Sequence, residues 1–185
     1  MLDDVYQEVE HKMERSIEAL RRDLSRIRTG RASLALLDGI RIDYYGTPTP
    51  LNQMATLSVP ESRLITIQPW DKTQLATIER AIQSSDLGLT PTNDGTIIRL
   101  AIPALTAERR QELVKQVKKM GEESKIALRN VRRDGNETLK SFEKEKLVSE
   151  DDMRRGQEQV QKITDRHIAN VDDILQTKEH EVMEV

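Results

Sequence analysis

The chain has 185 residues, of which 33% are charged and 36% are hydrophobic, and its net charge is -3. This composition fits a folded protein rich in exposed helix, and the absence of cysteine excludes a disulfide framework and thiolate chemistry. No apolar run resembles a signal peptide or a membrane span, so we expect a cytoplasmic protein without a membrane partner.

Residues 2–28 are predicted to form a long amphipathic helix. Apolar residues recur at spacings of three and four from Leu2 to Ile27, with polar residues between them. Asp3 suits the positive end of such a helix. Gly30 is expected just beyond its end, at a position that favours a left-handed backbone.

From residue 31 to residue 104 the pattern changes to short β-branched runs broken by Pro and Gly, which indicates a small α+β module. Strands are predicted at residues 40–45, 64–67 and 97–102, with a weaker candidate at residues 55–59. Turns are predicted at Gly46 to Pro50 and at Asn93 to Gly95.

A short helix is predicted inside this module. Asp71 and Gln74 resemble a capping box, and the helix should end near Gly88. Trp70 is expected to be a core residue at the corner between strand and helix, because a module of this size has a modest core. Of the adjacent Tyr44 and Tyr45, we expect at least one in the core, although both types of ring also stack on bases.

Residues 105–146 are predicted to form a long basic helix with Thr106 as its N-cap. The segment holds twelve Lys and Arg against eight Asp and Glu, inside a chain that is otherwise acidic. One flank of its apolar seam carries a basic ridge, made of Lys115, Lys118, Lys125, Arg129, Arg132 and Arg133. Composition alone leaves open whether this ridge docks on a polyanion or is a solvated face balanced by an acidic neighbour.

A third helix is predicted to begin at a capping box of Ser149 and Asp152. His167 lies on its seam and is expected to be a core or boundary residue. Gly121, Gly135 and Gly156 lie on or beside the helix seams. Since each glycine costs about 1 kcal/mol relative to alanine in a helix, we favour close helix approach over bending as their role.

The element order predicts an α+β protein. Residues 1–30 and 105–185 form a long three-helix bundle, or rod, and residues 31–104 form a β/α/β module inserted between its first two helices. Two chain crossings tether the module, which should restrict its motion to one swing or twist. Because three helices of one chain can bury a shared seam, we expect a monomer.

Enzymatic chemistry finds little support in the sequence. The three histidines are far apart and show no metal-ligand spacing, and no Gly-rich phosphate loop or nucleophile elbow occurs. Exposed carboxylate pairs such as Asp172 and Asp173 are typical of a solvated helix face. We therefore expect no catalytic residue, no metal and no cofactor, and a carboxylate hydrolase remains only a weak alternative.

Arg129, Arg132 and Arg133 occupy positions i, i+3 and i+4, so their guanidinium groups project from adjacent turns. Guanidinium groups favour bidentate contact with phosphate, and phosphate contact carries no sequence readout. The cluster therefore favours folded RNA recognised by shape. Arg28 and Arg31 either extend this footprint or simply terminate the first helix.

Five segments together resemble the bacterial ribosome recycling factors, and they run in the family's order through nearly the whole chain. They are Arg28-Thr-Gly-Arg-Ala-Ser33, Tyr44-Tyr-Gly-Thr-Pro-Thr-Pro-Leu51, Ser85-Asp-Leu-Gly-Leu89, Leu105-Thr-Ala-Glu-Arg-Arg110 and Arg129-Asn-Val-Arg-Arg-Asp134. One departure is Gly135, where the family pattern leads us to expect alanine.

This resemblance implies an L-shaped molecule about the size of a transfer RNA. It also implies a translation factor that, with elongation factor G and GTP hydrolysis, splits the post-termination ribosome and releases it from messenger RNA. The expected partners are the ribosomal RNA of the large subunit and elongation factor G, with no DNA and no nucleotide bound by the chain itself. The alternative is a helical adaptor or chaperone, which would not associate with ribosomes.

Carried over by position, the resemblance makes Arg132 the principal contact with large-subunit ribosomal RNA. The further expected contacts are Arg129, Arg133, Arg28 and Arg31, with Lys118 and Lys125 added from the basic ridge. The inserted module is the part expected to meet elongation factor G. The expected hinge residues are Gly30, Arg31, Pro103 and Ala104.

Overall fold

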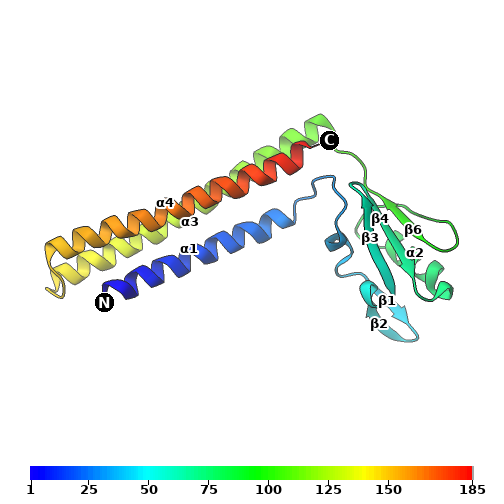
Figure 1. Cartoon of the computed structure of the whole chain (residues 1–185), viewed down its shortest axis with the longest axis horizontal. Helices are drawn as coiled ribbons and strands as arrows, with labels where there is room; N and C mark the ends of the chain where they lie inside the picture. The colour runs from blue at the N-terminus through cyan, green and yellow to red at the C-terminus, as the bar shows by residue number, and fades with distance from the viewer. Residues whose placement is uncertain (185) are drawn as a thin grey trace. The chain divides into compact units, whose positions relative to one another are not determined.

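The computed structural model describes residues 1–184, and the chain divides into two compact units. One unit, the bundle, joins Met1–Arg28 to the chain from Thr106 onward, and the other, the inserted module, is Thr29–Leu105. The bundle holds the long helices, which are α1 (Leu2–Ser25), α3 (Ala107–Lys144) and α4 (Glu150–Met183) (Figure 1). The α+β class and the long helices predicted from the sequence are confirmed.

The helix starts follow the predicted caps. Thr106 Oγ1 accepts a hydrogen bond from the Arg109 amide at 3.1 Å. The capping box before α4 is complete, because Ser149 Oγ accepts from the Asp152 amide and Asp152 Oδ2 accepts from the Ser149 amide. Along the described chain, no helix is both long enough and apolar enough to span a membrane.

The first helix ends earlier than predicted. Its last residue is Ser25, although Ile27 beyond it is still buried. The apolar spacing therefore continues past the end of the helix, which explains why periodicity alone placed the end at residue 28. Gly30 does have a left-handed backbone, with φ of +76°, but it lies in the inserted module, beyond the helix cap.

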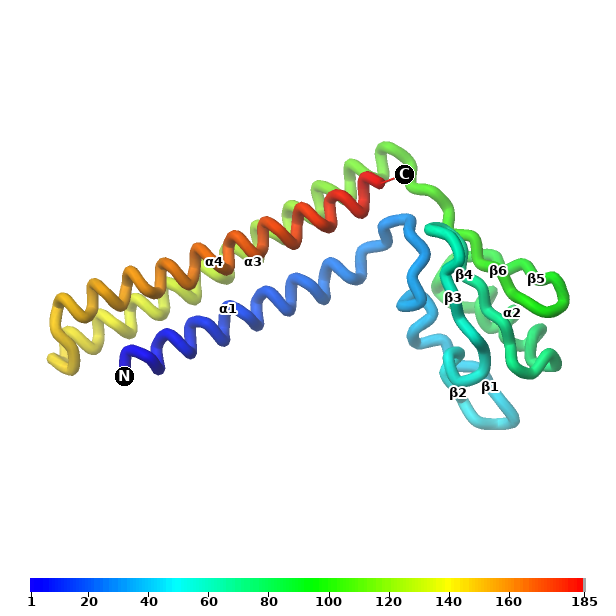
Figure 2. The backbone as a smooth tube through the Cα atoms, viewed as in Figure 1, coloured from blue at the N-terminus to red at the C-terminus, as the bar shows by residue number. Residues whose placement is uncertain are grey.

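The three long helices run side by side and bury an aliphatic seam (Figure 2). Its fully buried members include Met13 on α1, Val117 and Leu128 on α3, and Val160 on α4. Aliphatic packing of this kind contributes roughly 1.5–3 kcal/mol per fully buried side chain. The seam therefore holds α3 rigidly against both of its neighbours.

Close helix approach at the glycines is confirmed. A Cβ atom added to Gly135 would lie 2.8 Å from Cγ2 of Val9, and one added to Gly156 would lie 3.0 Å from Cδ1 of Leu139. A Cβ at Gly121 would collide with the side chain of Leu175. These glycines let α1 and α4 pack closely on α3.

The inserted module is built on a four-stranded antiparallel sheet with the order β3-β4-β6-β5. The strands are β3 (Ala55–Glu61), β4 (Leu64–Pro69), β5 (Pro91–Asn93) and β6 (Ile98–Ala101). Helix α2 (Leu75–Gln83) packs Ile78 and Ile82 into the core of this module. A separate two-stranded sheet pairs β1 (Arg41–Tyr44) with β2 (Thr47–Pro50).

One detail of the module was predicted wrongly because proline was interpreted as a turn signal. Pro48 and Pro50 lie in strand β2, where Pro48 pairs with Asp43 and Pro50 with Arg41. Proline is tolerated there because a strand in a two-stranded sheet has a free edge that needs no amide donor. Strand β5, which begins at Pro91, was not predicted.

The capping box of Asp71 with Gln74 is also wrong. Asp71 Oδ1 instead accepts hydrogen bonds from the amide and the hydroxyl of Thr73, at 3.0 and 2.6 Å, and caps a short 3₁₀ turn before α2. The Thr73 hydroxyl, followed by its amide, holds the pKa of the Asp71 carboxyl below its usual range. The aspartate was correctly identified as a cap, but its partner lies one residue earlier.

The aromatic residues of the module divide between core and surface. Trp70 is 65% exposed and donates its indole N–H to Thr56 Oγ1 at 2.9 Å, so its prediction as a core residue is wrong. Ile65, Ile67 and Pro69 take the buried positions of β4, and strand alternation places the next residue on the other face. Tyr44 packs against the core as expected, whereas Tyr45 is 77% exposed.

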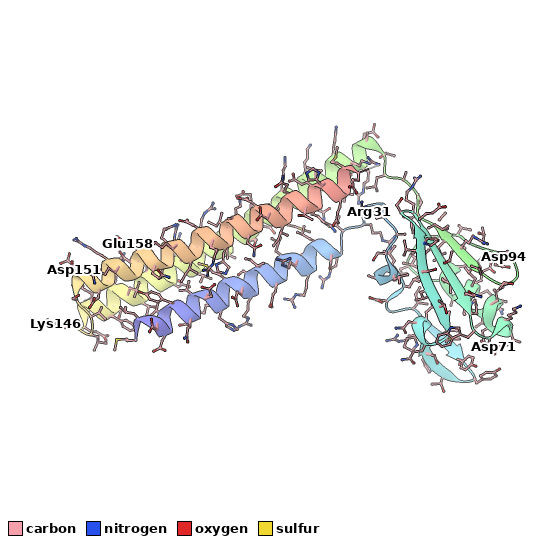
Figure 3. The ribbon with its side chains drawn as sticks, viewed as in Figure 1. Arg31, Asp71, Asp94, Lys146, Asp151 and Glu158 are labelled. Carbon is pink, nitrogen blue, oxygen red and sulfur yellow. The ribbon has the colours of Figure 1, made fainter. Side chains whose placement is uncertain are left out.

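The predicted turn between β5 and β6 is confirmed and is stabilised by Asp94, which is labelled in Figure 3. Its Oδ1 atom accepts from the amides of Ile97 and Thr96, at 2.8 and 2.9 Å, and its Oδ2 atom accepts from Arg99 at 2.8 Å. The bond from the Ile97 amide, followed by those from Arg99 and Thr96, lowers the pKa of Asp94 far below its usual value.

Replacing Gly135 by alanine should destabilise the bundle by about 1 kcal/mol, because overpacking against Val9 exceeds the gain in helix propensity. The χ1 angle of valine is stiff in a helix, so Val9 cannot easily turn away. Urea unfolding followed by far-UV circular dichroism measures the effect. In the double variant V9A/G135A the loss should be smaller than the sum of the single losses, whereas additive losses would contradict the contact.

Asp94 should make the inserted module sensitive to acid. Because its pKa is lower in the folded state than in the unfolded state, its stabilising effect is present above its unfolded pKa and is lost as the pH falls further. In Asp94→Asn the urea midpoint should decline less than in the wild type between about pH 5 and about pH 2. The fluorescence of Trp70, the single tryptophan, reports unfolding of this module. An equal decline of the urea midpoint in Asp94→Asn and in the wild type would contradict the role of the carboxylate.

Candidate nucleic-acid interface

Arg132 is held by an amide rather than by a carboxylate. Its Nη1 atom donates to Gln161 Oε1 on α4 at 3.4 Å, and Gln161 Nε2 donates in turn to Asp165 Oδ1 at 2.8 Å. This chain of contacts orients the guanidinium at the flank of α3 that faces α4. This contact occupies one N–H of the guanidinium and does not neutralise its charge, so the charge and the remaining donors of Arg132 stay available to an anion.

The other arginines of the predicted cluster are exposed. Arg129 and Arg133 lie on the solvent side of α3, one helical turn apart. Among the described residues neither one forms an ion pair, and the same holds for Lys115 and Lys118 on the preceding turns. Most of the basic ridge therefore presents positive charge that no neighbouring carboxylate neutralises.

Lys125 differs from the rest of the basic ridge. Its Nζ atom lies 2.6 Å from Asp172 Oδ1 on α4 and 3.9 Å from Glu122 Oε1 on its own helix, and its side chain is only 16% exposed. The ion pair to Asp172 joins α3 to α4. The charge of Lys125 is therefore neutralised within the bundle. Its partner Asp172 is remote in the sequence, so the sequence did not indicate this difference from the other cations of the basic ridge.

Arg28 and Arg31 fall in different units of the structure. Arg28 is the last residue of the first bundle segment, and Arg31 lies near the start of the inserted module (Figure 3). Both are exposed. The structure therefore places both on protein surfaces, and only Arg28 on the unit that carries the basic ridge.

The two tethers are fixed to the β3–β4 hairpin of the module. The Ala32 amide donates to the Ser62 carbonyl at 2.7 Å, and the Ile102 amide donates to the Arg63 carbonyl at 2.8 Å. A Cβ atom on Gly30 would lie 3.1 Å from Cγ of Leu105, so the two tethers also contact each other. The residues outside these two hydrogen bonds are 29–31 and 103–105.

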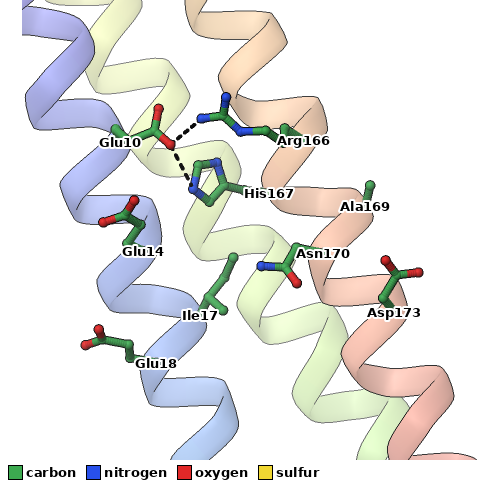
Figure 4. Close-up of a pocket in the computed structure, with 9 residues that line it drawn as sticks. All are labelled: Glu10, Glu14, Ile17, Glu18, Arg166, His167, Ala169, Asn170 and Asp173. Carbon is green, nitrogen blue, oxygen red and sulfur yellow. Dashed lines mark hydrogen bonds and ion pairs between the residues drawn. The ribbon is translucent and has the colours of Figure 1, made fainter.

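A second cluster lies where α1 meets α4 (Figure 4). His167 is 5% exposed, as predicted for a seam residue, and its Nδ1 atom donates to the Ile163 carbonyl at 2.7 Å. Its Nε2 atom faces Glu10 Oε1 at 3.6 Å, and the same oxygen pairs with Arg166. Glu14 completes a group of three possible metal ligands. Because Arg166 already balances Glu10, we interpret the cluster as an ion-pair network between helices.

The sequence spacing did not indicate this cluster. Glu10 and Glu14 lie four residues apart on α1, and a helix places such a pair on one face. The partner His167 comes from the far end of the chain. Only the parallel packing of α1 against α4 brings the three side chains together (Figure 4).

Comparison with known proteins identifies close relatives over the whole chain. A family model described as ribosome recycling factor matches residues 20–183. The chain is 58% identical to the ribosome-recycling factor of Syntrophomonas wolfei subsp. wolfei and 59% identical to that of Desulfatibacillum aliphaticivorans. Each alignment covers 100% of this chain and 100% of the relative.

Two solved structures are similar over the full length. One is a solution structure of a ribosome recycling factor, with 40% identity, a TM-score of 0.75, and coverage of 100% of this chain and 98% of that one. The other is the Thermus thermophilus (T. thermophilus) factor, described with Escherichia coli (E. coli) elongation factor G bound to the E. coli post-termination complex. It has 43% identity, a TM-score of 0.64, and coverage of 100% of both chains.

Proposed function

Because the chain belongs to the ribosome recycling factor family, we propose that it is a translation factor that splits the post-termination ribosome together with elongation factor G. GTP hydrolysis by elongation factor G supplies the energy, and the chain itself is not an enzyme. Splitting frees the ribosome from messenger RNA in the cytoplasm for another round of synthesis. The relative described with elongation factor G on a post-termination complex supports this role.

The observation that carries the proposal is the set of unneutralised arginines on a stiff helix. Arg129 and Arg133 are exposed, and Arg132 is oriented by an amide that leaves its charge available. Three guanidinium groups on adjacent turns match the regular phosphates of folded RNA. Since phosphate contacts are independent of sequence, the bundle recognises the large-subunit RNA by its shape.

Within this footprint Arg132 is the principal contact, supported by Arg129 and Arg133, and Lys118 extends it toward the start of α3. Lys125 contributes little, because its charge is already paired with Asp172. Arg28 and Arg31 act as secondary RNA contacts near the tethers.

The inserted module contacts elongation factor G. The force that elongation factor G applies to the module is transmitted to the bundle through the two tethers. The hydrogen bonds of Ala32 and Ile102 fix both tethers to the β3–β4 hairpin. Backbone rotation is therefore confined to the residues outside these bonds, which include Gly30, Arg31, Pro103 and Ala104. Because two chain segments join the module to the bundle, the module can swing or twist but cannot tumble freely.

The competing function is a helical adaptor or chaperone whose basic ridge only keeps it soluble. That function predicts no association with ribosomes. Co-sedimentation with large ribosomal subunits over a series of salt concentrations separates the two, and a splitting assay with elongation factor G and GTP tests recycling directly. Absence of both binding and splitting would reject the proposed function.

Arg132→Ala should weaken binding to large subunits about tenfold at moderate salt, because a hydrogen bond to a charged group is lost. The slope of log affinity against log salt should fall by about one, which corresponds to one phosphate contact. Co-sedimentation measures both quantities. The circular dichroism spectrum should be unchanged, since the Arg132 side chain is not part of the aliphatic seam.

Two variants control for this result. Arg132→Lys keeps the charge but loses the bidentate geometry, so it should retain most of the salt slope while losing affinity. Lys125→Ala removes the same formal charge from the same helix, but that charge is already paired, so its slope should change less than that of Arg132→Ala. Equal slopes in Arg132→Ala and the wild type would contradict the phosphate contact.

Gly30→Ala should slow splitting about fivefold, because a left-handed φ of +76° strains alanine by about 1 kcal/mol and the new methyl group presses on Leu105. Binding to large subunits should be unchanged. Gly39→Ala is the matched control, because it has a similar φ of +86° and no atom within 4 Å. Equal slowing by both variants would show loss of module stability instead of a hinge effect.

A further inference from the structure

Ile126 on α3 is an exposed large aliphatic residue, with 52% of its surface accessible. The buried residues Val117, Leu128 and Gly135 mark the opposite side of the helix. At about 100° per residue, Arg129 and Arg133 lie on the same side as Ile126, three and seven positions further on. An apolar side chain therefore stands in line with the exposed arginines.

The Ile126 side chain does not contribute to the packing of the bundle. It points away from the aliphatic seam, and alanine would be a better helix former at an exposed position. Among the described residues, no other large exposed hydrophobic side chain lies on α3. Its position in line with Arg129 and Arg133 makes the side chain available to whatever these arginines bind.

We propose that Ile126 is an apolar anchor that contacts a ribose or base face of the large-subunit RNA. This contact lies beside the phosphates that Arg129 and Arg133 bind. This inference rests on the proposed function. A folded RNA strand presents sugar and base surfaces beside its phosphates, and an apolar side chain next to two guanidinium groups matches that arrangement.

The surrounding charges favour RNA over a protein partner. On the side toward the end of α3, Ile126 is followed by Arg129 and Arg133, which attract phosphate. On the other side, the exposed carboxylates of Glu122 and Glu123 repel it, so the phosphates nearest Ile126 are expected on the side of Arg129 and Arg133. A protein hot spot is usually a cluster of apolar residues inside a ring of neutral contacts, and a single isoleucine among full charges does not provide one.

The first test compares Ile126→Ala and Ile126→Thr with the matched control Leu147→Ala. Leu147 is 51% exposed in the same unit but lies beyond the end of α3. Both changes at position 126 should weaken large-subunit binding about fivefold, because the burial of an apolar side chain is lost. The salt slope should remain that of the wild type, because no phosphate contact is removed. The control should bind as the wild type does.

Wild-type affinity in both Ile126 variants would overturn the proposal, and so would a reduced salt slope. If Arg132→Ala still weakens binding in that case, the proposed function stands and only the anchor fails. If the wild-type chain itself does not bind large subunits, the proposed function fails and the anchor fails with it. Thermal unfolding should be unchanged in Ile126→Ala, so that a loss of binding is not a loss of fold.

The second test identifies what Ile126 contacts. Because the chain contains no cysteine, Ile126→Cys provides a unique attachment point for a photoreactive maleimide. On large subunits the reagent at position 126 should crosslink to ribosomal RNA, and the same reagent on Leu147→Cys should give a different pattern. A crosslink from position 126 to a ribosomal protein would overturn the proposal, and so would the absence of any crosslink.

Discussion

The contact between Arg132 and Gln161 determines how the bundle presents this guanidinium group on its surface. A carboxylate at position 161 would lock the guanidinium into an internal ion pair, and the charge would then cost desolvation energy to recover. The amide instead fixes the direction of the side chain and leaves the charge in place. Asp165 accepts a hydrogen bond from Gln161 and not from Arg132. Its carboxylate is therefore separated from the guanidinium by the amide of Gln161. Orientation and availability are thereby combined in one side chain.

That contact is useful only if α3 and α4 keep their spacing. The glycines at positions 121, 135 and 156 allow the helices to approach so closely that a methyl group would meet a neighbouring side chain. Lys125 with Asp172 adds an ion pair between α3 and α4, and Arg166 with Glu10 adds one between α4 and α1. Such partly exposed pairs contribute little energy individually, so the aliphatic seam provides most of the stability. The pairs mainly fix which faces of the helices meet.

The sequence predicted those parts of the structure that depend on local signals. The caps at Thr106 and Ser149 follow from hydrogen bonds within one helical turn, and the long seams follow from apolar spacing. Features that depend on remote neighbours were not predictable. Lys125 looked like any other cation of the ridge until Asp172 was placed beside it, and Trp70 looked like a core residue until the face of β4 was known. Composition left the role of the basic ridge open and the arginine spacing favoured folded RNA, whereas ribosome recycling came from the family resemblance alone.

The distribution of ion pairs explains how an acidic chain can present a basic face. Carboxylates on α1 and α4 pair with cations where the helices meet, as Glu10 does with Arg166 and Asp172 with Lys125. Among the described residues of α3, Arg129 and Arg133 form no ion pair, although the net charge of the chain is -3. The exposed arginines of α3 therefore form a local patch of positive charge on a chain that is acidic as a whole. The same number of arginines spread evenly over the surface would bind more weakly and without a fixed orientation.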